Sequence, residues 1–327
     1  MKIFVYNYRE LDEGEYFSKF AKEFGAEIVY TQYSPRENSV KLAEGSKYIS
    51  IVTTKIDEAL LKQFHDIGVE MISSRTVGYD HIDLEAAKRL GIKVCNGSYP
   101  PNTVADYTLM LMLMTARKAG LIIERVKQQN FTTPGLQGRN LSRMTVGIMG
   151  TGRVGKAVIK RLAGFGCRIL AYSRHEDEEV KQYASYVSLE QLYAECDMIS
   201  LHMPATKDNY HIIHKESIEQ MKDKVIIINT ARGSLINIQD LITGVKSGKI
   251  GGAGLDVLEN EAGVFKKDLR GKVMDNSQIA ALQELPNVIL TPHVAYYTDE
   301  AISNMVFSSV KSCYAEEKGL ENPWRIV

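Results

Sequence analysis

The stretch Thr145-Val-Gly-Ile-Met-Gly-Thr-Gly-Arg-Val-Gly155 decides the fold, because it sets Gly150, Gly152 and Gly155 in G-x-G-x-x-G spacing. The three glycines serve a tight turn, a close backbone approach to a pyrophosphate, and the packing of a helix on a strand. An apolar strand pattern precedes them, an amphipathic helix pattern follows, and a second strand, Arg168–Tyr172, comes at the right distance. An unliganded glycine turn is the alternative, but this context favours a dinucleotide bound at the N-terminus of the helix.

Strand and helix patterns alternate on both sides of this stretch, which is typical of parallel sheets with helices on their faces. The downstream series predicts six strands, the content of a doubly wound nucleotide-binding domain. These six are Thr145–Met149, Arg168–Tyr172, Met198–Leu201, Val225–Asn229, Gly252–Asp256 and Val288–Thr291. Five more are predicted upstream, at Lys2–Tyr6, Glu27–Tyr30, Tyr48–Val52, Met71–Ser73 and Lys93–Cys95.

Tyr99-Pro100-Pro101-Asn102 separates the two series, since consecutive prolines continue neither a helix nor an interior strand. A long helix is predicted over about Thr103–Gln129, and a last helix, Asp299–Glu317, is expected to return to the first domain. The predicted class is α/β with two doubly wound parallel-sheet domains. A Rossmann-type cofactor domain spans 101–296, a discontinuous substrate domain comprises 1–100 and 297–327, and an active-site cleft lies between them.

Composition excludes several other classes of protein. The chain has 327 residues, 44% hydrophobic and 24% charged, with a formal net charge of zero, so nothing draws it to nucleic acid or an anionic membrane. The apolar run Tyr107–Ala116 is shorter than the roughly 20 residues that a bilayer requires. Charged residues follow the N-terminus too early for a signal peptide. Four scattered cysteines without metal-ligand spacing predict reduced thiols in a cytoplasmic protein and no metal site.

The end of the second strand of the cofactor domain predicts the choice of cofactor. NAD-specific sites carry an acid there that binds the ribose 2′-hydroxyl, whereas this chain has Ser173 followed by Arg174. A hydroxyl and a guanidinium can bind a 2′-phosphate that a carboxylate would repel. NADPH is therefore expected to be favoured, with NADH possible. In the alternative, Arg174 faces solvent and Glu176 or Asp177 binds the ribose.

Residues just after the strands carry the chemistry, because ligands of open α/β sheets bind outside the carboxyl ends of the strands. Arg232, Glu261 and His293 follow three successive strands. Arg232 can bind a substrate carboxylate and polarise a carbonyl oxygen as negative charge develops. His293 can give that oxygen a proton, while Glu261 can orient the imidazole and favour its charged form. Reduction of a 2-oxo acid needs these three groups.

Each of these residues also has an ordinary interpretation. Arg232 could be a loop cation beside a helix start, and Glu261 with Glu259 could form a solvated acidic face. The joint placement of the three after successive strands favours catalysis. A lone histidine after a strand is usually a turn or capping residue, as we expect for His65, His81, His202, His211 and His214.

Five segments carry a family resemblance that covers essentially the whole chain. They are 74–83 (S-R-T-V-G-Y-D-H-I-D), the loop 150–155, 229–233 (N-T-A-R-G), 254–261 (G-L-D-V-L-E-N-E) and 291–298 (T-P-H-V-A-Y-Y-T). In this order they resemble the D-2-hydroxy-acid dehydrogenases, especially the D-lactate dehydrogenase branch. The Tyr172-Ser173-Arg174 departure is most similar to the vancomycin-resistance D-lactate dehydrogenases, which favour NADPH.

The resemblance implies roles for particular residues. Arg232, Glu261 and His293 would be the catalytic three, the backbone N–H groups of Val77 and Gly78 would hold the substrate carboxylate, and Tyr99 would close over it. A homodimer through the long helix after Pro101 is also implied. The implied cofactor contacts are Gly150, Gly152, Arg153, Val154, Gly155, Ser173, Arg174, Met203, Pro204, Asn209, Thr230, Ala231 and Asp256.

Other functions remain to be weighed. A non-enzymatic dinucleotide sensor similar to the corepressors of this family is one, although no peptide-binding or disordered segment is visible. Relatives acting on formate, phosphoglycerate, glyoxylate or hydroxypyruvate are others, and Glu261 argues against the formate enzymes, which typically have Gln there. Tyr99, Tyr296 and Tyr297 should border the substrate, and their bulk favours pyruvate and D-lactate. A larger branched, aromatic or acidic 2-oxo acid is the alternative.

Overall fold

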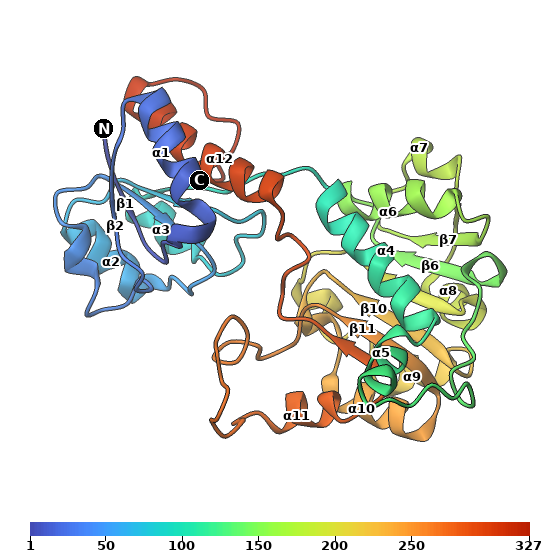
Figure 1. The fold of residues 1–327 in the computed structure, drawn as a ribbon. Coiled ribbons are helices and arrows are strands. Elements are labelled where there is room, and N and C mark those ends of the chain that lie inside the picture. The colour runs from blue at the N-terminus through green and yellow to red at the C-terminus, as the bar shows by residue number, and fades with distance from the viewer. The chain divides into compact units, whose positions relative to one another are not determined.

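The computed structural model describes residues 1–327, which divide into two compact units. Unit 1 comprises Met1–Pro100 together with Tyr297–Val327, and unit 2 comprises Pro101–Tyr296 (Figure 1). Each unit has its own parallel sheet and its own buried core. No helix of either unit is both long enough and apolar enough to cross a membrane.

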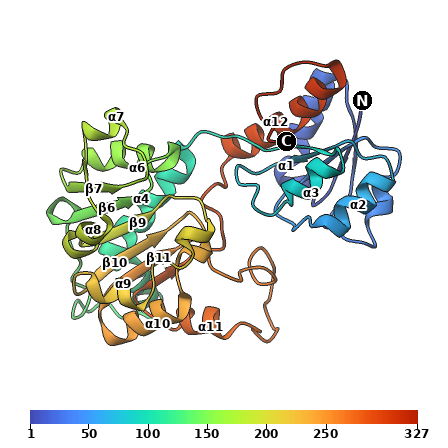
Figure 2. The ribbon, with the colours of Figure 1, turned by 180° about the vertical axis from the view of Figure 1, so that it is seen from behind.

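Unit 1 is built on a five-stranded parallel sheet with the strand order β2-β1-β3-β4-β5, one of the two common doubly wound orders. Its strands are β1 (Lys2–Val5), β2 (Glu27–Tyr30), β3 (Tyr48–Ile51), β4 (Met71–Ser74) and β5 (Lys93–Cys95). Its helices are α1 (Glu10–Phe24), α2 (Glu58–Asp66), α3 (Leu84–Arg89) and α12 (Asp299–Lys318). The last helix, α12, lies beside α1 in both views of the ribbon (Figures 1 and 2).

The β1 strand shows why this sheet is covered on both faces. Successive side chains of a strand point to opposite faces, so a strand buried on both sides is apolar throughout. Ile3 and Val5 belong to the core cluster that includes residues of α1 and α12. Phe4 belongs to the opposite cluster, which includes residues of α2 and α3. The two ends of the chain therefore build one face of unit 1 together.

Unit 2 contains a seven-stranded parallel sheet with the order β12-β11-β10-β9-β6-β7-β8. Its strands are β6 (Thr145–Met149), β7 (Arg168–Tyr172), β8 (Ser185–Tyr186), β9 (Met198–Leu201), β10 (Val225–Asn229), β11 (Ile250–Leu255) and β12 (Val288–Leu290). Its helices are α4 (Asn102–Ala116), α5 (Ala119–Lys127), α6 (Arg153–Ala163), α7 (Glu178–Lys181), α8 (Leu189–Glu195), α9 (Lys215–Gln220), α10 (Ile238–Ser247) and α11 (Ser277–Gln283).

The strand order reverses between β6 and β9, as in a Rossmann sheet, and ligands of such sheets bind at this switch point. Alternation again fixes the two faces of the sheet. Ile226 and Ile228 of β10 pack in the cluster with α4 and α6. Val225 and Ile227 pack in the opposite cluster with α8, α9 and α10. The loops after β6, β7, β9, β10, β11 and β12 all leave from the carboxyl edge.

The structure corrects two sequence predictions. The long helix over Thr103–Gln129 is broken into α4 and α5, because Lys118 adopts a left-handed backbone with φ of 56°. The turn is held there by Lys118 Nζ, which donates to the carbonyl of Gly135 at 2.9 Å. The cofactor sheet also has seven strands rather than six. The missed strand, β8, has only two residues, too few to leave an alternation pattern in the sequence.

Candidate active site

The glycine-rich loop after β6 has the geometry that its sequence predicts. Gly150 has a φ of 96°, and an added Cβ would lie 2.8 Å from the carbonyl carbon of His202. A Cβ on Gly155 would lie 2.0 Å from the carbonyl oxygen of Gly150, so only glycine allows α6 to pack this closely. Gly152, the N-cap of α6, has open space at its Cβ and provides no side-chain cap. The loop thus leaves room beside the N-terminus of α6, whose positive dipole end suits an anionic pyrophosphate.

The loop after β7 presents a guanidinium at the position that is predicted to select the cofactor. Ser173 is half-buried, whereas Arg174 and His175 are exposed and form no ion pair or hydrogen bond within the protein. The two alternative ribose acids are already engaged. Asp177 caps α7 through the backbone N–H groups of residues 179 and 180 and contacts Lys156, and Glu176 pairs with Lys181 at 2.8 Å.

Glu261 and His293 form a carboxylate–imidazole pair. The Nδ1 atom of His293 lies 2.5 Å from Oε1 of Glu261, and the other carboxylate oxygen accepts a hydrogen bond from the backbone N–H of Leu258 at 2.9 Å. This second contact fixes the carboxylate while it holds the ring. The Nε2 atom of His293 makes no hydrogen bond to the protein, and the ring is 28% exposed. That nitrogen is therefore able to exchange a proton with a ligand.

Asp256 holds the segment that carries His293. Its fully buried carboxylate accepts hydrogen bonds from Thr291 Oγ1 at 2.6 Å and from the backbone N–H groups of Val294 at 2.9 Å and Ala295 at 2.8 Å. His293 has a φ of 58°, an unusual backbone for a residue with a side chain, and such strain needs surrounding contacts to maintain it. The sequence suggested Asp256 only as a cofactor contact, so this structural role was missed.

Arg232 lies on the loop after β10, next to the segment that carries Glu261. The side chain of Asn229 holds this loop, since Nδ2 donates to the carbonyl of Arg232 at 2.9 Å and Oδ1 accepts from the N–H of Ala231 at 3.0 Å. A Cβ on Gly233 would lie 2.0 Å from the carbonyl carbon of Leu258, so the two loops are in direct backbone contact. Strands β10, β11 and β12 are neighbours, and their ends bring the predicted catalytic loops to one edge of the sheet.

A second carboxylate–imidazole pair lies on the same edge. Nε2 of His211 lies 2.8 Å from Oε2 of Glu259, and the Tyr210 hydroxyl donates to Oε1 of Glu259 at 2.7 Å. The rings of Tyr210 and His211 are stacked, with centroids 3.8 Å apart. The sequence predicted only a turn or capping role for His211, and nothing in its spacing indicated the partner 48 residues away.

Comparisons with known proteins identify the family of the chain. The family model described as "D-isomer specific 2-hydroxyacid dehydrogenase, NAD binding domain" matches residues 109–295. A D-specific alpha-keto acid dehydrogenase of Enterococcus faecium is 41% identical, over 96% of each chain. An aromatic 2-oxoacid reductase of Clostridium sporogenes is 43% identical, over 94% of this chain and 93% of its own. The solved apo-structure of D-lactate dehydrogenase from Escherichia coli superposes with a TM-score of 0.89 at 32% identity, with 100% of both chains covered.

The chain belongs to the D-isomer specific 2-hydroxyacid dehydrogenase family. This confirms the predicted family and the predicted fold of two parallel-sheet α/β domains. It also confirms the predicted reaction class, in which an oxidoreductase with an NAD-binding domain reduces a 2-oxo acid to the D-2-hydroxy acid.

The remaining predicted cofactor residues of this dehydrogenase lie in the first turn of α6 and on the loops after β9, β10 and β11. Asn209 braces its own loop, because Nδ2 donates to the carbonyl of Pro204 at 2.8 Å and Oδ1 accepts from the N–H of Thr206 at 2.7 Å. The Thr230 hydroxyl lies 2.8 Å from that of Thr108 and ties its loop to α4. Half-buried side chains that pack against the core of unit 2 include those of Val154, Met203 and Ala231.

The predicted substrate residues Val77 and Gly78 of the dehydrogenase follow β4 in unit 1. Their backbone N–H groups donate no hydrogen bond within the protein, although their carbonyls accept bonds from Asn96 and Thr76. Behind this loop, the fully buried Arg75 contacts Glu13 at 3.1 Å and anchors the end of the strand. Unsatisfied donors at the surface of a firmly anchored loop suit a carboxylate.

Two tyrosines complete the set of predicted substrate residues. Tyr99 is half-buried in unit 1. Tyr296, in unit 2, meets the His293 ring edge-on with centroids 6.4 Å apart, and the ammonium of Lys266 lies 5.4 Å from the Tyr296 ring. Tyr296 is therefore the predicted substrate residue that contacts the proposed acid/base directly.

Proposed function

We propose that the dehydrogenase reduces a small 2-oxo acid with His293 as the acid/base, Glu261 as its orienting partner and Arg232 as the carboxylate clamp. The single observation that carries this proposal is the 2.5 Å contact between Nδ1 of His293 and Glu261, which leaves Nε2 available to a ligand. The fold supports it, since the ends of β10, β11 and β12 collect the three residues at the ligand edge of the sheet.

The residues divide the work of the reaction. Bound NAD(P)H supplies a hydride to the carbonyl carbon of the substrate. As negative charge grows on the carbonyl oxygen, His293 donates its Nε2 proton to that oxygen, and Glu261 stabilises the imidazolium before transfer. Arg232 binds the carboxylate, and we propose that the N–H groups of Val77 and Gly78 share that anion.

The cofactor would be held by the glycine-rich loop and the loops after β7, β9 and β10. Gly152 offers the open approach for the pyrophosphate, and the exposed Arg174 at the end of β7 offers a guanidinium for a 2′-phosphate. Because Asp177 and Glu176 are engaged by lysines, we propose that NADPH is preferred over NADH.

The kcat/KM values for the two cofactors test this preference. NADPH should give the higher value, and Arg174→Ala should lower the value for NADPH while leaving that for NADH nearly unchanged. A wild-type preference for NADH would contradict the proposal.

The preferred substrate is proposed to be pyruvate, in line with the bulk of Tyr99, Tyr296 and Tyr297. The aromatic 2-oxoacid reductase at 43% identity favours a second candidate, an aromatic or branched 2-oxo acid. A panel of 2-oxo acids assayed with both cofactors decides between them. The highest kcat/KM on pyruvate supports the first candidate, and the highest on phenylpyruvate or a branched acid supports the second. A loss of turnover in H293A of about 10²–10⁴-fold with every 2-oxo acid that wild type reduces would support the proposed acid/base.

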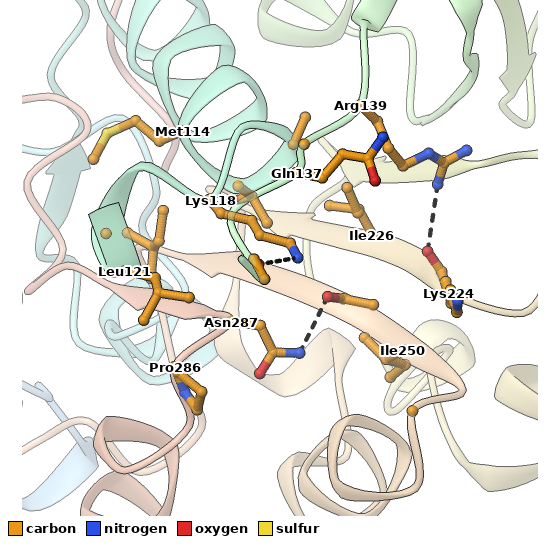
Figure 3. A pocket seen from close by; sticks show the side chains of 18 residues that line it. Met114, Lys118, Leu121, Gln137, Arg139, Lys224, Ile226, Ile250, Pro286 and Asn287 are labelled. Atoms are coloured by element: carbon orange, nitrogen blue, oxygen red, sulfur yellow. Dashed lines mark hydrogen bonds between the residues drawn. The ribbon is translucent and has the colours of Figure 1, made fainter. Parts of the chain in front are cut away.

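We also propose that the enzyme is a homodimer that associates through α4 and α5. The α5 helix has no buried residue, and Ile123 and Val126 are each 49% exposed. Beside α4 and α5 lies a pocket of about 670 Å³, whose lining includes the apolar Met114, Leu121 and Ile250 together with polar side chains such as Lys118, Arg139 and Asn287 (Figure 3). Apolar surface of this kind on a soluble oligomer usually meets a partner subunit.

Light scattering of the double variant Ile123→Glu, Val126→Glu tests the dimer. Wild type should have the mass of two chains and the variant that of one, whereas two chains in both would place the interface elsewhere.

We further propose a cytoplasmic location. All four cysteines are free, and burial raises the pKa of the Cys95 thiol to about 11 and that of Cys196 to about 12, which keeps both protonated.

A further inference from the structure

The missed strand β8 carries a tyrosine that joins two cofactor loops. The Tyr186 hydroxyl donates to Oγ1 of Thr151 at 2.9 Å and accepts from the backbone N–H of Asp177 at 3.0 Å. Thr151 stands between the first two glycines of the G-x-G-x-x-G loop and is only 6% exposed. Asp177 ends the loop that carries Ser173 and Arg174. One phenol therefore ties the predicted pyrophosphate loop to the loop that selects between the two cofactors.

The carboxylate of Asp177 is held on both oxygens. Oδ1 accepts from the backbone N–H of Glu179 at 2.9 Å and of Val180 at 3.4 Å, as the N-cap of α7. Oδ2 lies 2.5 Å from Nζ of Lys156, on the helix that opens at the glycine-rich loop. Hydrogen bonding to Lys156 lowers the pKa of Asp177, so the carboxylate stays charged and paired at neutral pH.

The other acids of this region are paired too. Glu179 contacts Lys156 at 3.2 Å and also contacts Lys160, while Glu176 pairs with Lys181. Arg174 and His175 have no such partner. The loop therefore presents the Arg174 guanidinium openly, whereas its carboxylates are engaged in ion pairs within the protein. A free carboxylate here would repel a 2′-phosphate and could bind the ribose hydroxyl of NADH instead.

We propose that Lys156 and Tyr186 are positioning residues for cofactor choice, because together they hold Asp177 as a helix cap and ion-pair partner that is withheld from the ribose. The inference rests on the proposed preference for NADPH and adds residues beyond Ser173 and Arg174. Lys156 acts through Asp177, and Tyr186 acts by fixing the backbone of Asp177 against the glycine-rich loop.

A double-mutant cycle on Lys156 and Asp177 tests the first half. The readout is the ratio of the NADH and NADPH dissociation constants, measured by quenching of reduced-nicotinamide fluorescence without substrate. Lys156→Gln should reduce the preference for NADPH about three- to tenfold, the size of a net charge exposed near an anion. In an Asp177→Asn background, where the cap is retained, Lys156→Gln should change the ratio little. A full effect of K156Q in both backgrounds would show that Lys156 contacts the phosphate itself and would overturn this mechanism.

Tyr186→Phe tests the second half, with Tyr193→Phe as the matched control. Tyr193 is another largely buried tyrosine of unit 2, and its hydroxyl donates to the carbonyl of Ile212 at 2.9 Å, on the loop after β9 and not on either of the two loops that Tyr186 joins. Y186F should lower the preference for NADPH about threefold or more, as expected for one lost hydrogen bond, and Y193F should leave it unchanged. Equal ratios in wild type and Y186F would contradict the role of Tyr186.

The outcome for wild type separates this inference from the proposal on which it rests. If wild type binds NADH more tightly than NADPH, both fail. If wild type prefers NADPH but neither K156Q nor Y186F alters the ratio, the preference stands and only the role of Lys156 and Tyr186 is wrong. Thermal unfolding of each variant shows whether the fold is kept, and a general loss of stability would weaken the binding of both cofactors without moving their ratio.

Discussion

Two carboxylate–imidazole pairs have their glutamates two residues apart on the segment after β11, and the difference between the pairs shows what the proposed catalytic pair requires. Glu261 and His293 approach to 2.5 Å, and Glu259 and His211 to 2.8 Å. The exposed fractions of their side chains are also similar, 26% and 28% in the first pair against 22% and 21% in the second. Neither distance nor burial separates the two pairs.

Their surroundings do separate them. Tyr210 stacks on the His211 ring and donates its hydroxyl to Glu259, so this pair is shared with a third side chain. In addition, His211 contacts Glu259 through Nε2, the ring nitrogen farther from the backbone. His293 uses Nδ1 instead and keeps Nε2 clear. We infer that the first pair serves proton transfer and the second fastens the loop after β9 to the segment after β11.

Replacing the two histidines is the strongest test of this comparison. His293→Ala should lower kcat about 10²–10⁴-fold, the usual contribution of a general acid, with the cofactor dissociation constant nearly unchanged. His211→Ala should alter kcat much less and act mainly on stability. Steady-state kinetics and cofactor binding measure both. Comparable losses of kcat in the two variants would contradict the inference that only the Glu261–His293 pair serves proton transfer.

Replacing the two glutamates should give a smaller but more specific effect. Glu261→Gln removes the negative charge beside the imidazole, so the protonated ring loses support. Reduction of the 2-oxo acid needs that protonated ring, and its rate falls as pH rises. The pH of half-maximal kcat/KM should therefore move to a lower value in E261Q, with kcat reduced about tenfold or more. Glu259→Gln is the control. An unchanged pH profile of kcat/KM in E261Q would contradict the proposed role of Glu261 as the partner of His293.

Asp256→Asn tests whether the hydrogen bonds of the Asp256 carboxylate hold His293 in the position where its Nε2 atom can reach a ligand. The buried carboxylate accepts from the N–H groups of Val294 and Ala295, and an amide can accept only part of that set. The variant should lose about 1–3 kcal/mol of stability, the cost of a buried donor without a partner, and kcat should fall several-fold. Urea unfolding and kinetics measure the two effects. A loss of cofactor binding with kcat unchanged would instead favour Asp256 as a cofactor contact.

Some features of this site could be predicted from the sequence and others could not, for physical reasons that differ between them. The loop positions of Arg232, Glu261 and His293 were predictable, because parallel strands end at one edge and alternation patterns locate those ends. The choice between Glu261 and Glu259 was not, since the two have the same chemistry two residues apart and their partners lie far along the chain. The motif resemblance, rather than spacing, selected Glu261.

Features that depend on tertiary contacts were missed for the same reason. The break at Lys118 comes with a left-handed backbone and a hydrogen bond to Gly135, which helix propensity cannot show. The three hydrogen bonds of Asp256 go to residues 35 to 39 positions later. The local sequence pattern predicts the helices, the strands and the edge of the sheet at which the strands end. The partner of each side chain is determined only when the helices and strands pack together.

A third histidine provides the smallest test, on stability rather than catalysis. His202 contacts no carboxylate, and its Nε2 lies 2.8 Å from the hydroxyl of the fully buried Ser200. Burial lowers the pKa of His202 to about 3, so the ring is neutral in the folded protein over the working range of pH. In the unfolded chain it titrates near its usual value, about 6.5.

The sign of the pH effect follows from these two values. Below about pH 6.5 the unfolded chain binds a proton that the folded chain does not, so His202 favours unfolding increasingly as the pH falls toward 3. His202→Asn should therefore lose less stability than wild type between about pH 7.5 and 5, by about 1–2 kcal/mol with allowance for the partial exposure of the ring. Urea midpoints at the two pH values measure this difference. If wild type and variant lost the same amount, His202 would have to be protonated in the folded protein at the lower pH, and the contrast between a ring paired with a carboxylate at 293 and a neutral ring at 202 would not hold.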